Sequence, residues 1–443
     1  MSADLSQKEQ LLAKIAAKDA VVGVIGLGYV GLPLALVFEE AGFPVLGFDI
    51  DPAKPDALQR GESYIKHIGQ DRVGAAFRRG RISATTDFSR LAACDAILVC
   101  VPTPLGRHRE PDISYIQRTA EAIAGAMRPG QLVILESTTY PGTTREELVP
   151  RFEARGFACG KDVFVAFSPE REDPGNPKFH TRNIPKVVGG IDAPSGNVAE
   201  ALYAAALEKV IRVSTAEVAE SGKLLENIFR SVNIALVNEL KMVFDKMGID
   251  VWEVIEAAKS KPFGFMPFYP GPGIGGHCIP LDPFYLSWKA AEHGAWARFI
   301  ELAGEINTSM PHYVVDKTVK GLNAEGKSIR GAKVLVLGLS YKADIDDDRE
   351  SPSYELIDLL ESLGADWAYC DPYIPSARLG RKNKRHMSSV PCMAEEFARY
   401  DALVVATAHA AFRQPALYAS AQLVVDTRNL FPAGTLACQV VRA

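Results

Sequence analysis

The chain has 443 residues, of which 47% are hydrophobic and 23% charged, and its formal net charge is −5. This length predicts two or three domains, and the slightly acidic balance argues against nucleic acid or an anionic membrane as a partner. No apolar run reaches the ~18–20 residues of a membrane-spanning helix. The seven cysteines are an odd number without a CxxC pair, so we expect no disulfide framework, no metal site and a reducing, cytoplasmic compartment.

The first part of the chain alternates short β-rich runs with stretches of helical length. The runs lie at residues 21–25, 44–48, 96–101, 132–136 and 163–167. This alternation is typical of βαβ units and predicts a parallel sheet in an N-terminal domain of residues 1–213.

A different pattern begins near residue 214. Residues 217–247 contain no proline and one glycine, and apolar residues recur every three or four positions, at Leu224, Ile228, Val232, Leu236 and Leu240. This spacing predicts one long amphipathic helix within a helical middle domain of residues 214–325. Such a helix suits either a dimer surface or a spacer between domains, and the pattern favours neither.

The alternation of strands and helices returns in residues 326–443. Runs at 333–338, 366–370, 402–406 and 423–425 predict strands, and residues 353–363 predict a helix. The expected fold is therefore α/β, with two Rossmann-like doubly wound parallel-sheet domains joined by a long central helix and a helical middle domain.

A glycine-rich turn follows the first predicted strand. Gly26, Gly28 and Gly31 form a GxGxxG pattern that opens a helix. In this context the glycines allow a tight turn, close approach of a pyrophosphate and close packing of the helix on the strand. The second strand ends at Asp49, eighteen residues after Gly31, where a carboxylate can bind ribose hydroxyls and would repel a 2′-phosphate. The unit predicts a cofactor site and favours NAD over NADP.

Two later strands end in threonine and proline. One is followed by Pro102-Thr103-Pro104, and the next by Thr138-Thr139-Tyr140-Pro141. Turn chemistry alone would account for these residues. However, the carboxyl ends of parallel strands form the ligand-binding edge of an open sheet, which favours contact with the cofactor.

Residues 270–283, PGPGIGGHCIPLDP, carry the thiol of Cys278 on a loop that has too many glycines for a packing segment. A buried cysteine is usually a small apolar side chain, and we interpret Cys94, Cys100 and Cys370 in that way because they lie in or beside predicted strands. A thiol nucleophile and a nicotinamide cofactor on one chain suggest that an aldehyde is captured as a thiohemiacetal and then oxidised.

Four further polar residues complete a candidate active site. Lys223 and Asn227 are spaced i, i+4 and project from one face of the long helix. Asp282 follows the thiol by four residues, and Glu170 follows a predicted strand. Together with Cys278 they supply a nucleophile, a cation, an amide donor and acid/base groups.

In chain order these motifs resemble those of the UDP-glucose/GDP-mannose dehydrogenase superfamily, nucleotide-sugar 6-dehydrogenases that use NAD twice. The resemblance runs from about residue 21 to residue 428 and includes the strings GLGYVGLP, CVPTPL, ESTTYPGTT, SPE, GGHCIPLDP and GLSYKADIDDDRES. The fuller strings resemble most closely the bacterial UDP-N-acetyl-D-glucosamine 6-dehydrogenases.

The resemblance implies a catalytic role for each matching residue. Cys278 matches the catalytic thiolate, and Asp282 matches the aspartate that orders a water beside it. Lys223 matches the lysine that works with this aspartate and water to deprotonate the 6-hydroxyl. Lys223 and Asn227 together resemble the pair that stabilises oxyanions at C6.

Further roles follow from the same resemblance. Thr139 matches a water-holding threonine, and Glu170 matches the proposed base for thioester hydrolysis. The implied NAD contacts are Gly26, Gly28, Tyr29, Val30, Gly31, Asp49, Lys54, Thr103, Thr138 and Arg349. The implied contacts of the nucleotide sugar are Lys223, Asn227, Tyr269, Gly273, Gly275, Tyr341, Lys342 and Arg428. Residues 326–443 are therefore expected to form the UDP-sugar-binding domain.

One position departs from the family pattern. Enzymes acting on UDP-glucose have an arginine, donated by the neighbouring subunit, where this chain has Lys261-Pro262-Phe263. Lysine lacks the bidentate fork of arginine, which argues against plain UDP-glucose as the substrate.

The leading hypothesis is a UDP-N-acetyl-D-glucosamine 6-dehydrogenase for bacterial surface-polysaccharide biosynthesis, such as O-antigen (lipopolysaccharide) or capsule, acting as a homodimer or larger homo-oligomer. The same reaction on UDP-N-acetylgalactosamine, UDP-N-acetylmannosamine or UDP-glucose is an alternative. A single-step β-hydroxyacid dehydrogenase, which needs no thiol, and a non-enzymatic nucleotide-sugar sensor are hypotheses of other classes.

Overall fold

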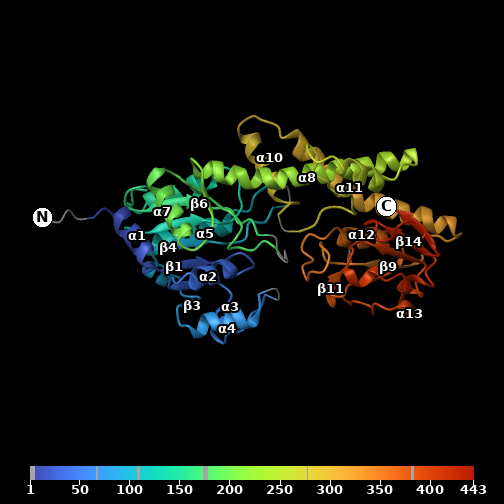
Figure 1. Cartoon of the computed structure of the whole chain (residues 1–443), viewed down its shortest axis with the longest axis horizontal. Coiled ribbons are helices and arrows are strands. Elements are labelled where there is room, and N and C mark those ends of the chain that lie inside the picture. Colours follow the sequence, from blue (N-terminus) through green and yellow to red (C-terminus); the bar gives the residue numbers. More distant parts are fainter. Residues whose placement is uncertain (1–4, 66–67, 107–109, 173–177, 277, 381–383) are drawn as a thin grey trace. The chain divides into compact units, whose positions relative to one another are not determined.

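The computed structural model describes residues 5–65, 68–106, 110–172, 178–276, 278–380 and 384–443. The chain divides into two compact units. The first comprises residues 1–226 and 288–295, and the second comprises residues 227–287 and 296–443. Each unit contains its own parallel β-sheet (Figure 1).

The sheet of the first unit has eight strands in the order β3-β2-β1-β4-β5-β6-β7-β8. All neighbours are parallel except β6 and β7. The strands are β1 (Val22–Ile25), β2 (Val45–Phe48), β3 (Ile82–Thr85), β4 (Ala96–Val99), β5 (Leu132–Leu135), β6 (Phe164–Phe167), β7 (Lys186–Gly190) and β8 (Val210–Arg212). The strand order reverses between β1 and β4, so a ligand is expected at the carboxyl ends of these two strands.

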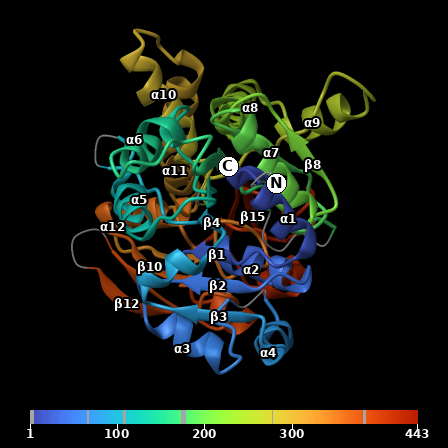
Figure 2. The ribbon, with the colours of Figure 1, turned by 90° about the vertical axis from the view of Figure 1, so that its left-hand side faces the viewer.

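Helices cover both faces of this sheet. Leu132 and Ile134 of β5 pack on one face with α1 (Gln7–Ala17), α2 (Gly31–Glu40) and α7 (Ala193–Ala204). Val133 and Leu135 of β5 pack on the other face with α5 (Ser114–Ala126) and α6 (Val149–Glu153). Two shorter helices, α3 (Ala53–Gln59) and α4 (Gln70–Arg78), pack against the edge strand β3 (Figure 2).

Helix α8 (Ala216–Met247) has 32 residues, a length of about 48 Å. It confirms the long helix expected at residues 217–247. The chain continues through α9 (Val251–Lys259), α10 (Asp282–Glu292) and α11 (Arg298–Ala324). Within the described ranges, no helix combines the length and the apolar character that a membrane span requires.

The sheet of the second unit has five parallel strands in the order β10-β9-β13-β14-β15. They are β9 (Lys333–Leu337), β10 (Asp366–Cys370), β13 (Ala402–Val405), β14 (Leu423–Asp426) and β15 (Gln439–Arg442). Val334 and Val336 of β9 pack with α11 and α12 (Pro352–Ser362), while the alternate residues Leu335 and Leu337 pack on the face that carries α13 (Ala394–Phe397). A hairpin of β11 (Ser376–Leu379) and β12 (Arg385–Ser388) completes the unit.

The fold class expected from the sequence is confirmed, because each of the two units is built on a parallel sheet covered by helices. Every strand expected from the sequence is present. The structure adds β3, β7, β8, β11, β12 and β15, and also α11. The division into domains of residues 1–213, 214–325 and 326–443 stays a prediction.

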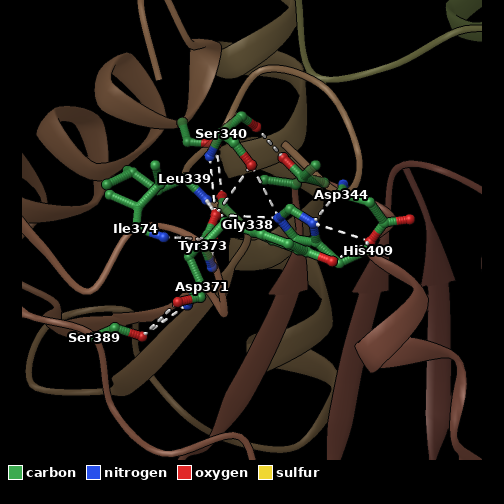
Figure 3. A network of polar contacts seen from close by, with 12 residues as sticks. Gly338, Leu339, Ser340, Asp344, Asp371, Tyr373, Ile374, Ser389 and His409 are labelled. Carbon is green, nitrogen blue, oxygen red and sulfur yellow. Dashed lines mark hydrogen bonds and ion pairs between the residues drawn. The ribbon is translucent and has the colours of Figure 1, made fainter. Parts of the chain in front are cut away.

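A buried carboxylate holds the turns at the carboxyl ends of β9 and β10. Asp371 accepts hydrogen bonds at 2.6–3.0 Å from four backbone amides, those of Leu339, Ser340, Tyr373 and Ile374 (Figure 3). Its Oδ2 also lies 3.1 Å from Nε2 of His409. Burial alone would raise the pKa of Asp371, but the hydrogen bonds from His409 and from the amides outweigh burial and lower the pKa to about 2.

We expect Asp371 to make the second unit sensitive to acid. Since its pKa is lower in the folded than in the unfolded protein, its stabilising contribution is complete above the unfolded value and is lost as the pH falls through about 2. Asp371→Asn should lower the free energy of unfolding by about 2 kcal/mol at pH 7, and by less at pH 4 and pH 3. Urea unfolding followed by circular dichroism measures this difference, with Asp366→Asn, at an exposed position of β10, as the control. An effect of the same size at all three pH values would contradict the prediction.

Candidate active site

The glycine turn after β1 has the shape that a dinucleotide requires. Gly26 has a φ of 89°, and a Cβ there would overlap the carbonyl oxygen of Cys100. A Cβ at Gly31, the first residue of α2, would overlap the carbonyl oxygen of Gly26. At Gly28, in contrast, a Cβ would meet no described atom within 4 Å. The turn is therefore packed against protein at its first and third glycines and open at the second, where a pyrophosphate would approach the amides of α2.

The carboxylate of Asp49 is buried at the end of β2. Its Oδ2 accepts a hydrogen bond from the amide of Leu27 at 2.9 Å and pairs with Nζ of Lys54 at 2.8 Å. Its Oδ1 accepts one from the amide of Asp51 at 3.0 Å. Asp49 and Lys54, both expected to contact NAD, are thus brought together beside the glycine turn, and they fit an NAD cofactor bound there.

Three threonines expected at the site follow β4 and β5. Thr103 and Thr139 are buried, and Thr138 is half-buried. The hydroxyl of Ser137 donates a hydrogen bond to the carbonyl oxygen of Val101 at 2.7 Å, which ties the ends of the two strands together. The buried hydroxyl of Thr139 has no hydrogen-bond partner among the described residues. A buried hydroxyl in this state fits a group that holds water or a ligand.

Glu170 lies beside a buried ionic cluster that the sequence analysis did not identify. Nζ of Lys186 lies 2.6 Å from Oε2 of Glu136 and 3.6 Å from Oε2 of Glu170. The hydroxyl of Tyr203 donates to the second oxygen of Glu136. The other oxygen of Glu170 accepts hydrogen bonds from the backbone amides of the next two residues, each at 2.6 Å. The position of Glu170 is thus set by its own turn and by Lys186.

The charges of this cluster depend on one another. Burial alone would lower the pKa of Lys186, but the neighbouring carboxylates of Glu136 and Glu170 raise it. Burial raises the pKa of Glu136, against the lowering effect of Lys186. In a buried ion pair of this kind, each charge offsets the desolvation cost of the other. Removing one partner therefore leaves the remaining charge buried without compensation.

In the second unit, Cys278 lies four residues before the start of α10, at the head of the turn that leads into this helix. Its carbonyl oxygen accepts hydrogen bonds from the amides of Leu281 at 3.1 Å and Asp282 at 2.8 Å. Asn227, which is 0% exposed, donates from Nδ2 to the carboxylate of Asp282, and Arg230 donates to Oδ1 of Asn227. Because arginine only donates and a carboxylate only accepts, the orientation of the amide is determined. The structure thus brings together Cys278, Asp282 and Asn227, and it adds Arg230, which the sequence analysis missed.

The glycine loop packs closely against the turn that follows β9 in the second unit. A Cβ at Gly275 would lie 2.6 Å from Cβ of Tyr341, and one at Gly276 would lie 3.0 Å from the ring of Tyr341. The amide of Gly276 also donates to the carbonyl oxygen of Arg349 at 3.0 Å. The expectation that this loop is not a packing segment is therefore wrong at these glycines, because the missing side chains make room for Tyr341.

A cavity of about 630 Å³ lies at one end of this loop. Tyr269 and Arg428 line it, together with Trp252, whose ring stacks on Tyr269 at a centroid distance of 5.6 Å. Nε of Arg428 donates to the carbonyl oxygen of Ala406 at 2.9 Å, and its guanidinium forms no ion pair within the described part of the chain. Burial lowers the pKa of Arg428 to about 10. A half-buried guanidinium of this kind suits an anionic ligand.

The remaining expected residues are also placed by the structure. Tyr29 and Val30 lie in the glycine turn of the first unit, and Lys223 is buried on α8 one turn before Asn227. Gly273 and Arg349 line a second cavity of about 700 Å³ in the second unit, and the guanidinium of Arg349 pairs with Asp347 at 2.6 Å. Lys342 follows Tyr341 in the turn after β9.

None of the seven cysteines, all of them described, forms a disulfide. No group of histidine, cysteine and carboxylate side chains in the described ranges could hold a metal ion.

A glycine turn with a buried carboxylate beside it defines the first unit as a Rossmann-type dinucleotide-binding unit of a dehydrogenase. The chain belongs to the UDP-glucose/GDP-mannose dehydrogenase family. The models of the NAD binding domain, the central domain and the UDP binding domain of this family match residues 20–207, 217–309 and 335–433. The chain is thus a member of a family of NAD-binding nucleotide-sugar dehydrogenases.

Named relatives cover almost the whole chain. The UDP-N-acetyl-D-glucosamine 6-dehydrogenase of Pseudomonas aeruginosa is 34% identical over 89% of this chain and 92% of its own length. The NDP-N-acetyl-D-galactosaminuronic acid dehydrogenase of Ralstonia nicotianae is 34% identical over 94% and 97%. Among solved structures, the UDP-D-ManNAc dehydrogenase of Pyrococcus horikoshii is 30% identical, covers 95% of this chain and 99% of its own, and superposes with a TM-score of 0.85.

We expect Lys186→Met to destabilise the first unit by about 3–5 kcal/mol, because it leaves the buried carboxylate of Glu136 without its ion-pair partner. The double variant Glu136→Gln, Lys186→Met removes both charges and should recover most of this loss. Urea unfolding of the two variants measures the difference, with Lys209→Met, at an exposed lysine just before β8, as the control. Equal destabilisation by the single and the double variant would contradict the mutual compensation.

Proposed function

We propose that the protein is a UDP-N-acetyl-D-glucosamine 6-dehydrogenase. In the proposed reaction one UDP-N-acetyl-D-glucosamine, two NAD⁺ and one water give UDP-N-acetyl-D-glucosaminuronate, two NADH and three protons. The observation that carries the proposal is the turn that joins Cys278 to the start of α10, where the carbonyl oxygen of Cys278 accepts from the amide of Asp282, the buried partner of Asn227. We further propose that the enzyme acts in the cytoplasm and supplies the synthesis of a bacterial surface polysaccharide, either O-antigen or capsule.

The first oxidation needs a base at the 6-hydroxyl and a donor for the developing oxyanion. Bound NAD⁺ would accept the hydride. Lys223, working with Asp282 and a water, would take the proton of the hydroxyl. Asn227 would donate to the oxygen at C6, and the hydrogen bond to Asp282 orients its amide for this task. The removal of such a donor typically costs about 10²–10³ in rate.

The thiol of Cys278 would hold the aldehyde between the two oxidations. A thiolate adds to the aldehyde carbon to give a thiohemiacetal, and loss of a second hydride gives a thioester. Water, activated by Glu170 and held by Thr139, then breaks the carbon–sulfur bond and releases the carboxylate. The buried unpartnered hydroxyl of Thr139 and the turn that fixes Glu170 support these roles.

The diphosphate and uridine would be bound by the second unit. Arg428 offers a half-buried cation at the end of the glycine loop, and Tyr269 offers an aromatic face beside it. Tyr341 and Lys342 lie in the turn after β9, at the carboxyl end of a parallel strand, where ligands of open sheets bind. The match of residues 335–433 to the UDP binding domain supports this assignment.

The choice of N-acetylglucosamine rests on the fuller sequence resemblance and on the relative from Pseudomonas aeruginosa. The names of the other two relatives keep the galactosamine and mannosamine derivatives as alternatives. Lys261, which takes the place of the arginine found in UDP-glucose enzymes, lies with its Nζ 4.9 Å from the ring centre of Phe263. A lysine in this position argues against UDP-glucose. Comparing kcat/KM for the four UDP-sugars decides between them.

We expect Cys278→Ala to abolish formation of the uronate, and Cys278→Ser to slow it by on the order of 10³ or more, because an alkoxide is a poor leaving group. The wild type should release two NADH for each sugar consumed, measured by absorbance at 340 nm against uronate by mass spectrometry. Cys438→Ala, at another partly buried cysteine of the second unit, is the matched control. One NADH per substrate and full activity of Cys278→Ala would instead indicate a single-step hydroxyacid dehydrogenase, and no NADH would indicate a sensor.

We also propose that α8 pairs with a second copy of the chain. Its exposed apolar residues are Val218, Leu225, Phe229, Leu236, Val243 and Met247, spaced by seven or four positions and 44–67% exposed. They form a stripe about 43 Å long on one side of the helix. An isologous dimer would bury this stripe against itself.

Leu236→Glu should therefore shift the protein from dimer to monomer at micromolar concentration, because it places a charge in the middle of the proposed interface. Light scattering coupled to size-exclusion chromatography measures the mass. Leu363→Glu, at an exposed leucine next to the end of α12, makes the same change elsewhere and should leave the dimer intact. A dimer that persists in Leu236→Glu would contradict the proposed surface.

A further inference from the structure

The turn that carries Tyr341 and Lys342 is attached to a buried histidine. His409 follows β13 and is 0% exposed, and its ring lies between Tyr373 and Phe412 at centroid distances of 5.1 and 5.3 Å. Two polar segments meet at this ring, the turn of residues 339–344 after β9 and the loop that begins at Asp371 (Figure 3). Neither the sequence motifs nor the proposed mechanism assigns His409 a role.

The hydrogen bonds determine which ring nitrogen carries the proton. Nδ1 of His409 accepts a hydrogen bond from the backbone amide of Asp344 at 2.9 Å. In a neutral imidazole the proton is then on Nε2, which lies 3.1 Å from the carboxylate of Asp371 and 3.0 Å from the hydroxyl of Ser340. His409 therefore uses one nitrogen as an acceptor for the turn and the other as a donor to Asp371.

Asp344 exchanges two hydrogen bonds with the segment that follows β13. While its amide donates to His409, its Oδ1 accepts a hydrogen bond from the amide of Ala410 at 2.9 Å. Asp344 also has a φ of 62°, in the left-handed region that costs free energy for most residues other than glycine. The two hydrogen bonds hold the turn in a conformation that it would otherwise leave easily.

This turn contacts the loop of the nucleophile. Tyr341 fills the space above Gly275 and Gly276, and its amide donates to the carbonyl oxygen of Asp347 at 3.1 Å. A displacement of the turn would therefore move Tyr341, Lys342 and the glycine loop together. His409 holds this turn at Asp344, whereas the contact with the glycine loop is made by Tyr341.

We propose that His409 is a positioning residue that holds the turn of residues 340–344 in place for the uridine diphosphate part of the substrate. The contact that does so is the acceptor Nδ1, which holds the amide of Asp344, whereas the donor Nε2 serves the stability of the second unit through Asp371. This inference rests on the proposed function, and it names the residue that shapes the nucleotide-binding turn.

Two variants separate the two nitrogens. In His409→Asn the side-chain oxygen can take the place of Nδ1 and accept from Asp344, but the donor to Asp371 is lost. In His409→Gln the longer amide can reach Asp371, but the acceptor at the position of Nδ1 is lost. The Kd of UDP for the intact protein, measured by isothermal titration calorimetry, is compared with the Tm of each variant.

His409→Gln should bind UDP about tenfold more weakly than the wild type, which corresponds to about 1.4 kcal/mol, with a smaller loss of Tm. His409→Asn should bind UDP within about twofold of the wild type while showing the larger loss of Tm. The KM of NAD should be unchanged in both. If the variant with the larger loss of Tm also had the weaker affinity for UDP, the proposal would be overturned. A histidine that only stabilises the second unit would give that result.

The comparison of the two His409 variants does not depend on which UDP-sugar the protein oxidises. If the wild type binds UDP but does not oxidise UDP-N-acetyl-D-glucosamine, the proposed function fails, and the comparison of the two variants still decides the role of His409. If the wild type does not bind UDP, both proposals fail.

Discussion

The absence of side chains at Gly271, Gly275 and Gly276 is the constraint on which the second unit's site depends. A Cβ at Gly271 would overlap the guanidinium of Arg428, and those at the other two glycines would crowd Tyr341. The loop backbone therefore lies directly against two side chains from the carboxyl ends of parallel strands. The same loop begins at the cavity beside Arg428, which Pro270 helps to line, and continues to Cys278, four residues before α10. The path of the loop that carries Cys278 therefore depends on the packing of its glycines.

In both units, a carboxylate is buried at the carboxyl ends of the parallel strands and is stabilised there by neighbouring groups. Carboxyl ends of parallel strands must present polar groups, yet the strands themselves are buried on both faces. In the first unit Glu136 is compensated by Lys186, and in the second Asp371 is compensated by backbone amides and His409. The amides satisfy Asp371 in its charged form, so its pKa is low, whereas Glu136 depends on a single cation. The charge in the first unit is therefore the more vulnerable to substitution.

The sequence predicted the elements that carry strong local patterns. The strands rich in valine, leucine and isoleucine and the continuous periodicity of α8 are such elements, and the glycine turn after β1 has a fixed spacing. The edge strands β3 and β8 lack such an apolar run, because β3 alternates between buried and more exposed positions and β8 has only three residues, none of them fully buried. Lys186 was missed because its partner Glu136 is fifty residues earlier, and only the order of the strands brings the two together. His409 was missed for the same reason, since its partners come from two other strand ends.

The glycines of the loop teach a further lesson about what such patterns mean. Their number argues in the sequence against a packing segment, but in the structure Gly275 and Gly276 make room for the side chain of Tyr341. The hydrogen bond between Asn227 and Asp282 adds a coupling that no motif could reveal. Because the carboxylate of Asp282 is the acceptor, the orientation of the amide of Asn227 depends on the position of Asp282. In the proposed mechanism, the residue that orders the water and the residue that stabilises the oxyanion therefore cannot act independently. A change at either one should alter the rates of both oxidations.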